Sequence, residues 1–209
     1  MKKLITEADV LNLIKAGLTE LVVAKNSVIS PLALDRIKHN KIRVVEQNSN
    51  SNENESFKNK QLAIGSDHTG VKAKKVLFEY LKQKGFDIID VGTFTEDAVD
   101  YPDIAYNVAS KVKIEEVDFG IILDSTGIPS CITANKVPGI RAATCYNEFS
   151  ARSSREHNNA NVLVMGAKAL GDETLKSIID VWLNSKFLGE RHQRRLDKIK
   201  TIEDKYLKP

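Results

Sequence analysis

From residue 61 onward, short apolar runs alternate with longer segments in which apolar residues recur every three or four positions. The apolar runs have the length of buried parallel strands, and the segments between them have the period of amphipathic helices. The predicted strands are 62–64, 87–91, 118–123, 139–144 and 162–166. The predicted helices lie around 76–84, 104–112, 149–156, 173–184 and 190–206. This alternation predicts an α/β fold with a doubly wound parallel sheet.

The first 46 residues follow a weaker pattern and are predicted to form a small appended domain. Thr6 can cap a helix that Gly17 ends, and Ser30-Pro31 can open a second helix. Short strands are predicted at 21–23 and 42–45. A unit of this size buries little core, so we expect contacts with a partner to stabilise it.

Residues 47–60 are polar and lack periodicity, which is typical of a flexible linker. The chain is therefore predicted to consist of a small domain at 1–46, a linker at 47–60 and a main domain at 61–209.

Composition narrows the class of protein. A net charge of +3 over 209 residues argues neither for nucleic acid nor for an anionic membrane as partner. Cys131 and Cys145 form no CxxC motif and no disulfide framework, which favours a reducing compartment. No apolar run approaches the length of a membrane span, and the start turns acidic too early for a secretory signal. We expect a soluble, cytoplasmic protein.

Polar residues punctuate the predicted strands and helices of the main domain. In open α/β sheets, ligands bind beyond the carboxyl ends of the strands. We expect one shared edge to hold the following set: Asp67, His68, Tyr101, Asp124, Ser125, Thr126, Gly127, Ile128, Pro129, Asn158, His157 and Lys168. Two histidines together with Asp67 and Asp124 favour a catalytic role, and a metal site is the weaker alternative because no paired ligand spacing is present.

The last predicted helix carries Arg191 and Arg195, which are four residues apart and share a helix face. Two guanidiniums on one face suit the geometry of a phosphate group. If this helix reaches a neighbouring subunit, the phosphate could sit in the strand-end cleft of that subunit.

Five motifs of the main domain resemble one enzyme family. They are Gly65-Ser66-Asp67-His68-Thr69-Gly70, Asp100-Tyr101-Pro102, and the segments 134–141, 150–162 and 189–195. Across about residues 61–200 the chain resembles the ribose-5-phosphate isomerase B and galactose-6-phosphate isomerase family. The resemblance implies a Rossmann-like fold and an isomerisation of a phosphorylated sugar without metal or other cofactor. It also implies a homodimer or homotetramer with an active site shared between subunits.

The resemblance also implies roles for single residues. His157 matches the histidine that opens the furanose ring, while Asp67 and His68 match contacts to ring oxygens and phosphate. Segment 125–129 matches the backbone cradle of the sugar and its enediolate. The remaining substrate contacts that it implies are Tyr101, Asn158, Lys168, Arg191 and Arg195.

Two departures from the family pattern stand in one stretch. Asp124 occupies the position of the catalytic cysteine of the family, and Pro129 replaces a glycine and removes a backbone donor. Some members use a glutamate where Ser130 stands, which serine cannot replace. A carboxylate can move a proton between C1 and C2, so Asp124 is predicted to be the base and Thr126 to bind the enediolate with the loop N–H groups.

Three functions remain open. The first is isomerisation of ribose 5-phosphate to ribulose 5-phosphate. The second is isomerisation of a hexose 6-phosphate of the galactose type, by this chain alone or as a subunit of a mixed assembly. The third is a catalytically silent protein that binds sugar phosphates.

The small domain has a resemblance of its own. Segments 4–10 and 29–35 resemble short N-terminal regions of enzymes from bacterial microcompartments, notably those of ethanolamine utilisation. This implies docking to a shell or cargo partner through residues 1–46 and a location inside a microcompartment. A stabilising appendage is the alternative.

Overall fold

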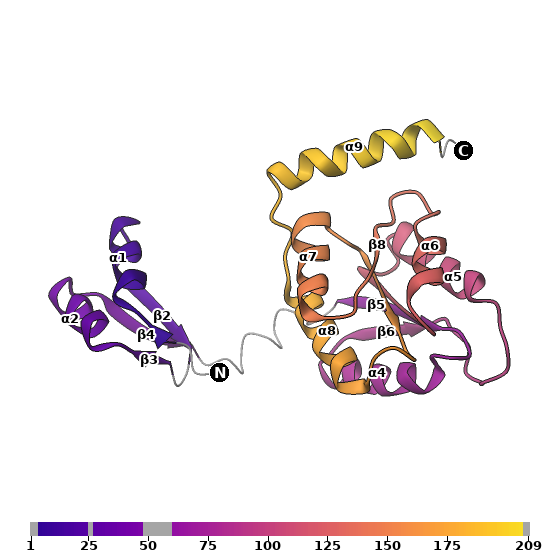
Figure 1. Cartoon of the computed structure of the whole chain (residues 1–209), viewed down its shortest axis with the longest axis horizontal. Helices are drawn as coiled ribbons and strands as arrows, with labels where there is room; N and C mark the ends of the chain where they lie inside the picture. Colours follow the sequence, from indigo (N-terminus) through magenta and orange to yellow (C-terminus); the bar gives the residue numbers. More distant parts are fainter. Residues whose placement is uncertain (1–3, 25–26, 48–59, 207–209) are drawn as a thin grey trace. The chain divides into compact units, whose positions relative to one another are not determined.

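A computed structural model describes residues 4–24, 27–47 and 60–206 of the chain (Figure 1). The chain divides into two compact units, Met1–Phe57 and Lys58–Pro209. The linker predicted at 47–60 lies outside the described residues except for its two end positions.

The N-terminal unit consists of a β-α-β arrangement that occurs twice. Its elements are β1 (Leu4–Ile5), α1 (Glu7–Lys15), β2 (Glu20–Ala24), β3 (Val28–Ile29), α2 (Pro31–His39) and β4 (Arg43–Gln47). The two halves share their strands, because β1 pairs with β3 and β2 pairs with β4, both in parallel.

The sequence carries traces of this repeat. Thr6 and Ser30 precede the two helices, and Gly17 and Lys41 follow them with positive φ angles of 71° and 52°. The apolar faces of the two halves meet in a core of buried side chains: Ile5, Val10, Leu21, Val23, Ala33, Ile37 and Ile42. The unit thus has a core of its own.

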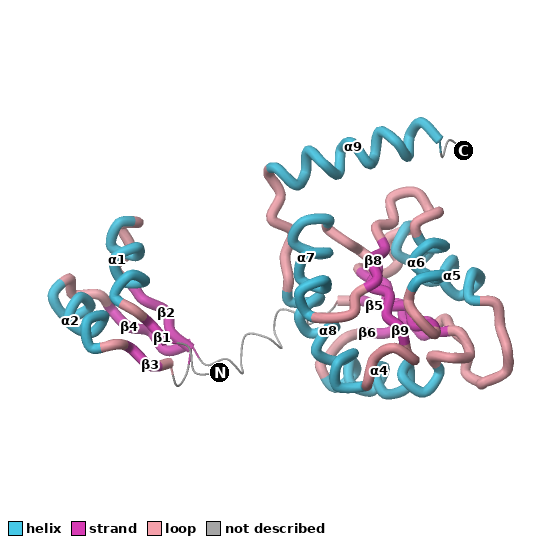
Figure 2. Tube along the Cα trace, viewed as in Figure 1, coloured by secondary structure: helices cyan, strands magenta, loops and turns pink. Residues whose placement is uncertain are grey.

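The larger unit contains one parallel sheet of five strands (Figure 2). The strands are β5 (Gln61–Ser66), β6 (Asp87–Asp90), β7 (Phe119–Asp124), β8 (Ala142–Thr144) and β9 (Val162–Gly166), in the order β6-β5-β7-β9-β8. All neighbouring pairs are parallel, so every strand ends at the same edge of the sheet. The predicted fold class is confirmed.

Helices cover both faces of this sheet, as the periodicity predicts. The helices α5 (Tyr101–Lys113) and α6 (Ile128–Ala134) pack together on one face. The helices α4 (Val71–Gln83), α7 (Glu148–Asn158) and α8 (Asp172–Asn184) pack together on the other. Strand residues alternate between these layers: Ala63 and Ile122 join the core with α5, and Leu62 and Ile121 therefore point to the opposite face.

The last helix, α9 (Arg191–Tyr206), contacts α7 and buries His192 and Leu196. No helix among the described residues is both long and apolar enough to cross a membrane. The structure differs from the prediction at two elements of the larger unit. The strand predicted at 139–144 is only Ala142–Thr144, because Gly139 takes a positive φ of 83°. Residues 128–134 form α6, which the sequence did not predict.

Candidate active site

Asp124 ends the central strand β7, and the residue is 1% exposed. Its Oδ1 accepts hydrogen bonds from the backbone N–H groups of Thr126, at 2.8 Å, and of Gly127. Its Oδ2 accepts from the N–H of Ser130 at 3.0 Å. The turn after β7 therefore wraps around the side chain of the residue that precedes it.

This arrangement bears on the predicted segment 125–129. Its last two residues belong to a helix, because α6 begins at Ile128 with Pro129 in its first turn, where proline is favoured. The backbone cradle predicted at 125–129 stays a prediction, but three of its N–H groups already have partners within the turn. The N–H groups of Thr126 and Gly127 already bind Asp124, and that of Ile128 donates to Thr126 Oγ1 at 3.2 Å. These donors are not free for an enediolate.

Two glycines allow the turn to lie against the end of β9. Gly127 has a φ of 82°, and a Cβ there would stand 2.9 Å from Thr144 Cγ2. A Cβ on Gly166 would stand 2.7 Å from the carbonyl of Thr126. Two residues that sequence reasoning missed hold the same turn: Thr144 Oγ1 donates to the Gly127 carbonyl at 2.7 Å, and the Tyr146 hydroxyl donates to the Thr126 carbonyl at 2.9 Å. Both lie at or after the carboxyl end of β8, and that position is the signal that could have found them.

The turn after β5 lies beside the turn after β7. The N–H of Asp67 donates to the Leu123 carbonyl at 3.1 Å, which ties the two strand ends together. The Asp67 carboxylate is almost fully buried and accepts from the N–H and the hydroxyl of Thr69, at 2.8 and 2.6 Å. His68 Nδ1 accepts from the N–H of Val99 at 3.3 Å, so a neutral His68 carries its proton on Nε2.

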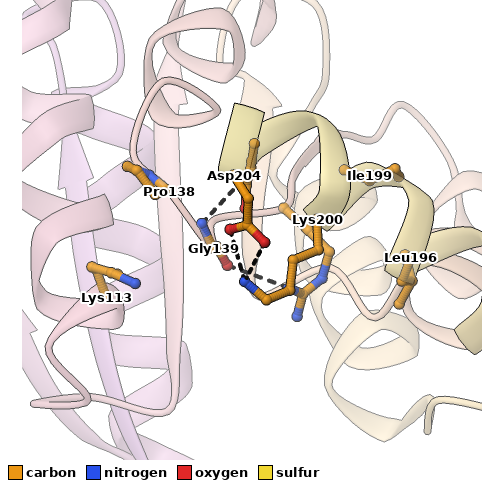
Figure 3. Close-up of a pocket in the computed structure, with 9 residues that line it drawn as sticks. Lys113, Pro138, Gly139, Leu196, Ile199, Lys200 and Asp204 are labelled. Carbon is orange, nitrogen blue, oxygen red and sulfur yellow. Dashed lines mark hydrogen bonds and ion pairs between the residues drawn. The ribbon is translucent and has the colours of Figure 1, made fainter. Parts of the chain in front are cut away.

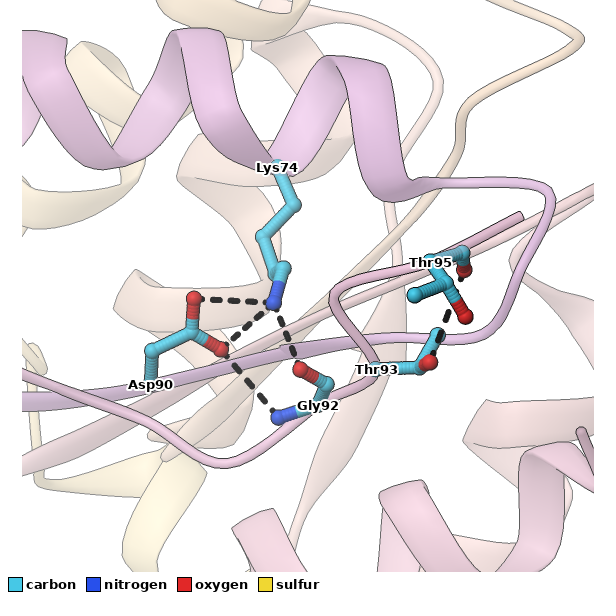
Figure 4. Close-up of polar contacts among 5 residues, drawn as sticks. All are labelled: Lys74, Asp90, Gly92, Thr93 and Thr95. Carbon is cyan, nitrogen blue, oxygen red and sulfur yellow. Dashed lines mark hydrogen bonds and ion pairs between the residues drawn. The ribbon is translucent and has the colours of Figure 1, made fainter. Parts of the chain in front are cut away.

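A buried ion pair anchors the segment that leads from β6 to this histidine contact (Figure 4). Lys74 is 3% exposed, and its Nζ contacts both carboxylate oxygens of Asp90, at 2.6 and 2.8 Å. The same ammonium donates to the Gly92 carbonyl at 2.6 Å and lies 4.3 Å from the centre of the Phe94 ring. This contact fixes the start of the segment that carries Val99 and ends at Tyr101.

The structure thus brings most of the predicted site residues to the carboxyl edge of the sheet. Lys168 follows β9 at this edge, where its N–H donates to the Ser125 carbonyl at 3.1 Å. We call the group at this edge the base cluster: Asp67, His68, Tyr101, Asp124, Ser125, Thr126, Gly127, Ile128, Pro129 and Lys168.

His157 and Asn158 lie elsewhere, and the prediction of one shared edge is wrong for them. Both residues end α7, which starts beyond β8 and returns the chain to the beginning of β9. A helix between two parallel strands ends at the amino edge of the sheet, and α7 with its 11 residues spans about 15 Å. These two side chains are therefore separated from Asp124 by the height of the sheet.

At the amino edge, His157 has partners of its own. Its Nδ1 lies 3.2 Å from Ser153 Oγ, and its ring stacks on that of His192 with centroids 4.4 Å apart and planes 3° from parallel. Arg191 Nε donates to His192 Nε2 at 3.3 Å, and Arg195 is exposed on the next turn of α9. We call His157, Asn158, Arg191 and Arg195 the acid cluster, and His192 packs beside it.

Two arginines hold the end of α7 that carries the acid cluster. Arg141 Nε donates to the carbonyls of Asn158 and Asn159, at 3.1 and 2.9 Å. The buried guanidinium of Arg155 binds the carbonyl of Ala160 and lies over the rings of Phe119 and Trp182. Cations at these carbonyls also suit the negative end of the helix dipole.

A cavity of about 550 Å³ lies under the other end of α9 (Figure 3). The Gly139 N–H donates to Glu203 Oε1 at 3.0 Å beside it, and Lys113, Arg141 and Lys200 contribute its positive charges. None of the predicted site residues lines it. In the part of the chain that the structure describes, no group of three or more side chains is arranged to hold a metal ion.

Comparisons with known proteins identify the family of the larger unit. The model of the Ribose/Galactose Isomerase family matches residues 62–199. Ribose-5-phosphate isomerase B of Escherichia coli is 42% identical over 146 residues, which is 70% of this chain and 98% of that protein. The N-terminal unit lies outside the residues that the family model matches.

Solved structures give the same result. Ribose-5-phosphate isomerase B of Clostridium thermocellum is similar with a TM-score of 0.69 and 47% identity, over 70% of this chain and 99% of that one. Ribose-5-phosphate isomerase B of Mycoplasma genitalium, solved with bound ribulose-5-phosphate, is similar with a TM-score of 0.67 and 42% identity, over 70% of this chain and 98% of that one. The predicted family and the Rossmann-like fold are confirmed, and the chain belongs to the ribose/galactose isomerase family.

Proposed function

We propose that the protein isomerises ribose 5-phosphate to ribulose 5-phosphate. The observation that carries this proposal is the match over 98–99% of the length of proteins named ribose-5-phosphate isomerase B, in Escherichia coli and Clostridium thermocellum. The reaction needs a base that moves a proton from C2 to C1 of the open sugar and groups that stabilise the enediolate between these steps.

Asp124 is the proposed base, and its hydrogen bonds single out one oxygen. A carboxylate oxygen has two lone pairs, and Oδ1 uses both for the N–H groups of Thr126 and Gly127. Oδ2 accepts only the Ser130 N–H among the contacts described, so it keeps a lone pair for the carbon-bound proton. We assign the proton transfer between C2 and C1 to Oδ2.

Stabilisation of the enediolate then falls to side chains rather than to the turn N–H groups. The Thr126 hydroxyl oxygen accepts from Ile128, and its O–H can donate to the substrate. Asp67, His68, Tyr101 and Lys168 complete the base cluster around the sugar.

A second copy of the chain is proposed to supply the acid cluster. Within one chain the two clusters lie at opposite edges of the sheet, so neither alone holds base, acid and phosphate ligands. In a homodimer or homotetramer, His157 of one subunit would protonate O4 of the furanose bound at Asp124 of the other. The C1–O4 bond breaks, C1 becomes the carbonyl carbon, and the proton of the anomeric hydroxyl passes to water. Asn158, Arg191 and Arg195 would bind the same sugar phosphate.

The test is the Asp124→Asn variant on a panel of pentose and hexose phosphates. Asparagine keeps the size of the side chain and one acceptor oxygen but cannot take the proton. We expect turnover of ribose 5-phosphate to fall by about four orders of magnitude with substrate affinity retained. Turnover within about threefold of the wild type would exclude Asp124 as the base. Activity of the wild type on a hexose 6-phosphate alone would replace the pentose in the proposal.

A second candidate is a silent protein that binds sugar phosphates. The observation that favours it is that Asp124 is buried and accepts three backbone hydrogen bonds from the turn, as a helix-capping carboxylate would. Calorimetric binding of ribose 5-phosphate without turnover on any sugar of the panel would establish this candidate and exclude the first.

For the N-terminal unit we propose docking to a shell or cargo partner of a microcompartment. The unit exposes apolar side chains that its own core does not cover: Leu18, Val22, Val28, Leu32, Leu34 and Val44. Deletion of residues 1–60 is expected to abolish co-purification with shell proteins and to leave isomerase activity intact. If the shortened protein still co-purified with shell proteins, docking through this unit would be wrong and a stabilising appendage would be the better interpretation.

A further inference from the structure

His192 has no role in the proposed reaction, but its ring stacks on that of His157, the predicted ring-opening residue. Its ring lies parallel to that of His157, with centroids 4.4 Å apart and an angle of 3°. His192 is 4% exposed, so the stack belongs to the packed interior between α7 and the first turn of α9.

The contacts of His192 define its protonation. Arg191 Nε donates to His192 Nε2, and a guanidinium can only donate, so a neutral ring carries its proton on Nδ1. That Nδ1 is buried and has no hydrogen-bond partner in the described structure. Burial, His157, Arg191 and Arg195 all lower the pKa of His192. The ring is therefore held neutral.

The neutral ring leaves His157 fixed on two sides. Ser153 Oγ contacts Nδ1 of His157, and His192 covers one face of its imidazole. Nε2 remains the nitrogen that can face a substrate. A neutral neighbour also places no second cation against the imidazole that is proposed to donate to O4.

We propose that His192 is a positioning residue, which holds the imidazole of His157 in the orientation that opens the sugar ring. This role rests on the proposed function, because it presupposes that His157 donates a proton to O4. The alternative is that His192 only anchors α9, which would affect all steps that need Arg191 and Arg195 alike.

The test compares two aldose phosphates. Ribose 5-phosphate closes into a furanose, whereas 4-deoxyribose 5-phosphate lacks O4 and stays open. His192→Asn removes the stack, and His192→Phe keeps an aromatic ring over His157 while losing both nitrogens. His157→Asn is the benchmark, and His39→Asn, on an exposed position of α2, is the matched control. Unfolding curves of each variant confirm that it is folded before kcat/KM is compared.

We expect His192→Asn to lose about tenfold to a hundredfold in kcat/KM on ribose 5-phosphate and less than about threefold on the 4-deoxy sugar. His192→Phe should stay within about threefold of the wild type on both sugars, as should His39→Asn. Equal losses on the two sugars for His192→Asn, or a His192→Phe variant as impaired as His192→Asn, would overturn the positioning role. Unchanged activity of His192→Asn would also overturn it. If the His157→Asn variant itself kept wild-type kcat/KM on ribose 5-phosphate, the proposed ring-opening role of His157 would be wrong. That result would count against the proposed function rather than against the positioning role alone.

Discussion

Separation of the base and acid clusters leads to a prediction about mixtures of inactive variants. Asp124→Asn damages the carboxyl edge, and His157→Asn damages the amino edge, which lies about 15 Å away along α7. If each site combines the carboxyl edge of one subunit with the amino edge of its partner, a mixed dimer contains one site with both substitutions. Its other site contains neither.

The magnitude follows from counting sites. Random exchange between equal amounts of the two variants makes half of the dimers mixed, and half of the sites in those are intact. The mixture should therefore recover about a quarter of the wild-type activity per chain. Purified variants are mixed, subunit exchange is followed by native mass spectrometry with one variant tagged, and ribulose 5-phosphate formation is measured.

A same-edge pair provides the control. Asp124→Asn mixed with Asp67→Asn leaves a substitution in every site of the mixed dimer, so activity should stay at the sum of the separate variants. Recovery in this control would show that activity returns for another reason. If mixed dimers form from the opposite-edge pair and activity does not rise, the shared site is refuted.

Three further predictions concern stability. The pKa of His192 is lowered in the fold, so His192 takes up a proton on unfolding at pH values below its ordinary pKa of about 6.5. In urea denaturation, the free energy of unfolding of the wild type should therefore fall as the pH is lowered from about 7.5 to about 5. The His192→Phe variant should lose less stability over the same range. Gly127→Ala should lower the free energy of unfolding, measured in urea, by about 1–3 kcal/mol, because φ is 82° there and the added Cβ would stand 2.9 Å from Thr144 Cγ2. Gly171→Ala is the control and should cost less than about 1 kcal/mol, because its added Cβ has nothing within 4 Å. Similar losses for the two variants would contradict the strain at Gly127. Lys74→Met should lower the free energy of unfolding by about 3 kcal/mol, because it leaves Asp90 without its buried partner. Lys72→Met removes one side of an exposed ion pair and should cost less than about 1 kcal/mol. Equal losses of stability in thermal unfolding would be inconsistent with this difference in burial.

Local pattern predicted the sheet of the larger unit well, because each strand is a short apolar run whose neighbours in sequence are helical. The same pattern placed Asp67 and Asp124 correctly, since residues that directly follow parallel strands share an edge. It placed His157 at the wrong edge, because a residue that ends a helix was treated like one that ends a strand. The polarity of a β-α-β unit is contained in the sequence and would have corrected this.

Other features depend on distances that no local pattern contains. The hydrogen bond from the Ser130 N–H to Asp124 requires the start of α6, a helix of 7 residues that the apolar pattern does not reveal. The His157–His192 stack joins two helices through the way α9 packs. The strands β1 and β3 have two residues each, too few for any periodicity.

The pairing inside the N-terminal unit has a consequence for how that unit assembles. Each of its two sheets takes one strand from each β-α-β half, so neither half can form a strand pair by itself. The unit must fold as a whole, and a protein cut between the halves would lose both sheets at once. Two chains that traded halves would keep every strand pair, which is the geometry of domain swapping. A swap of this kind would join two copies of the larger unit through their small units.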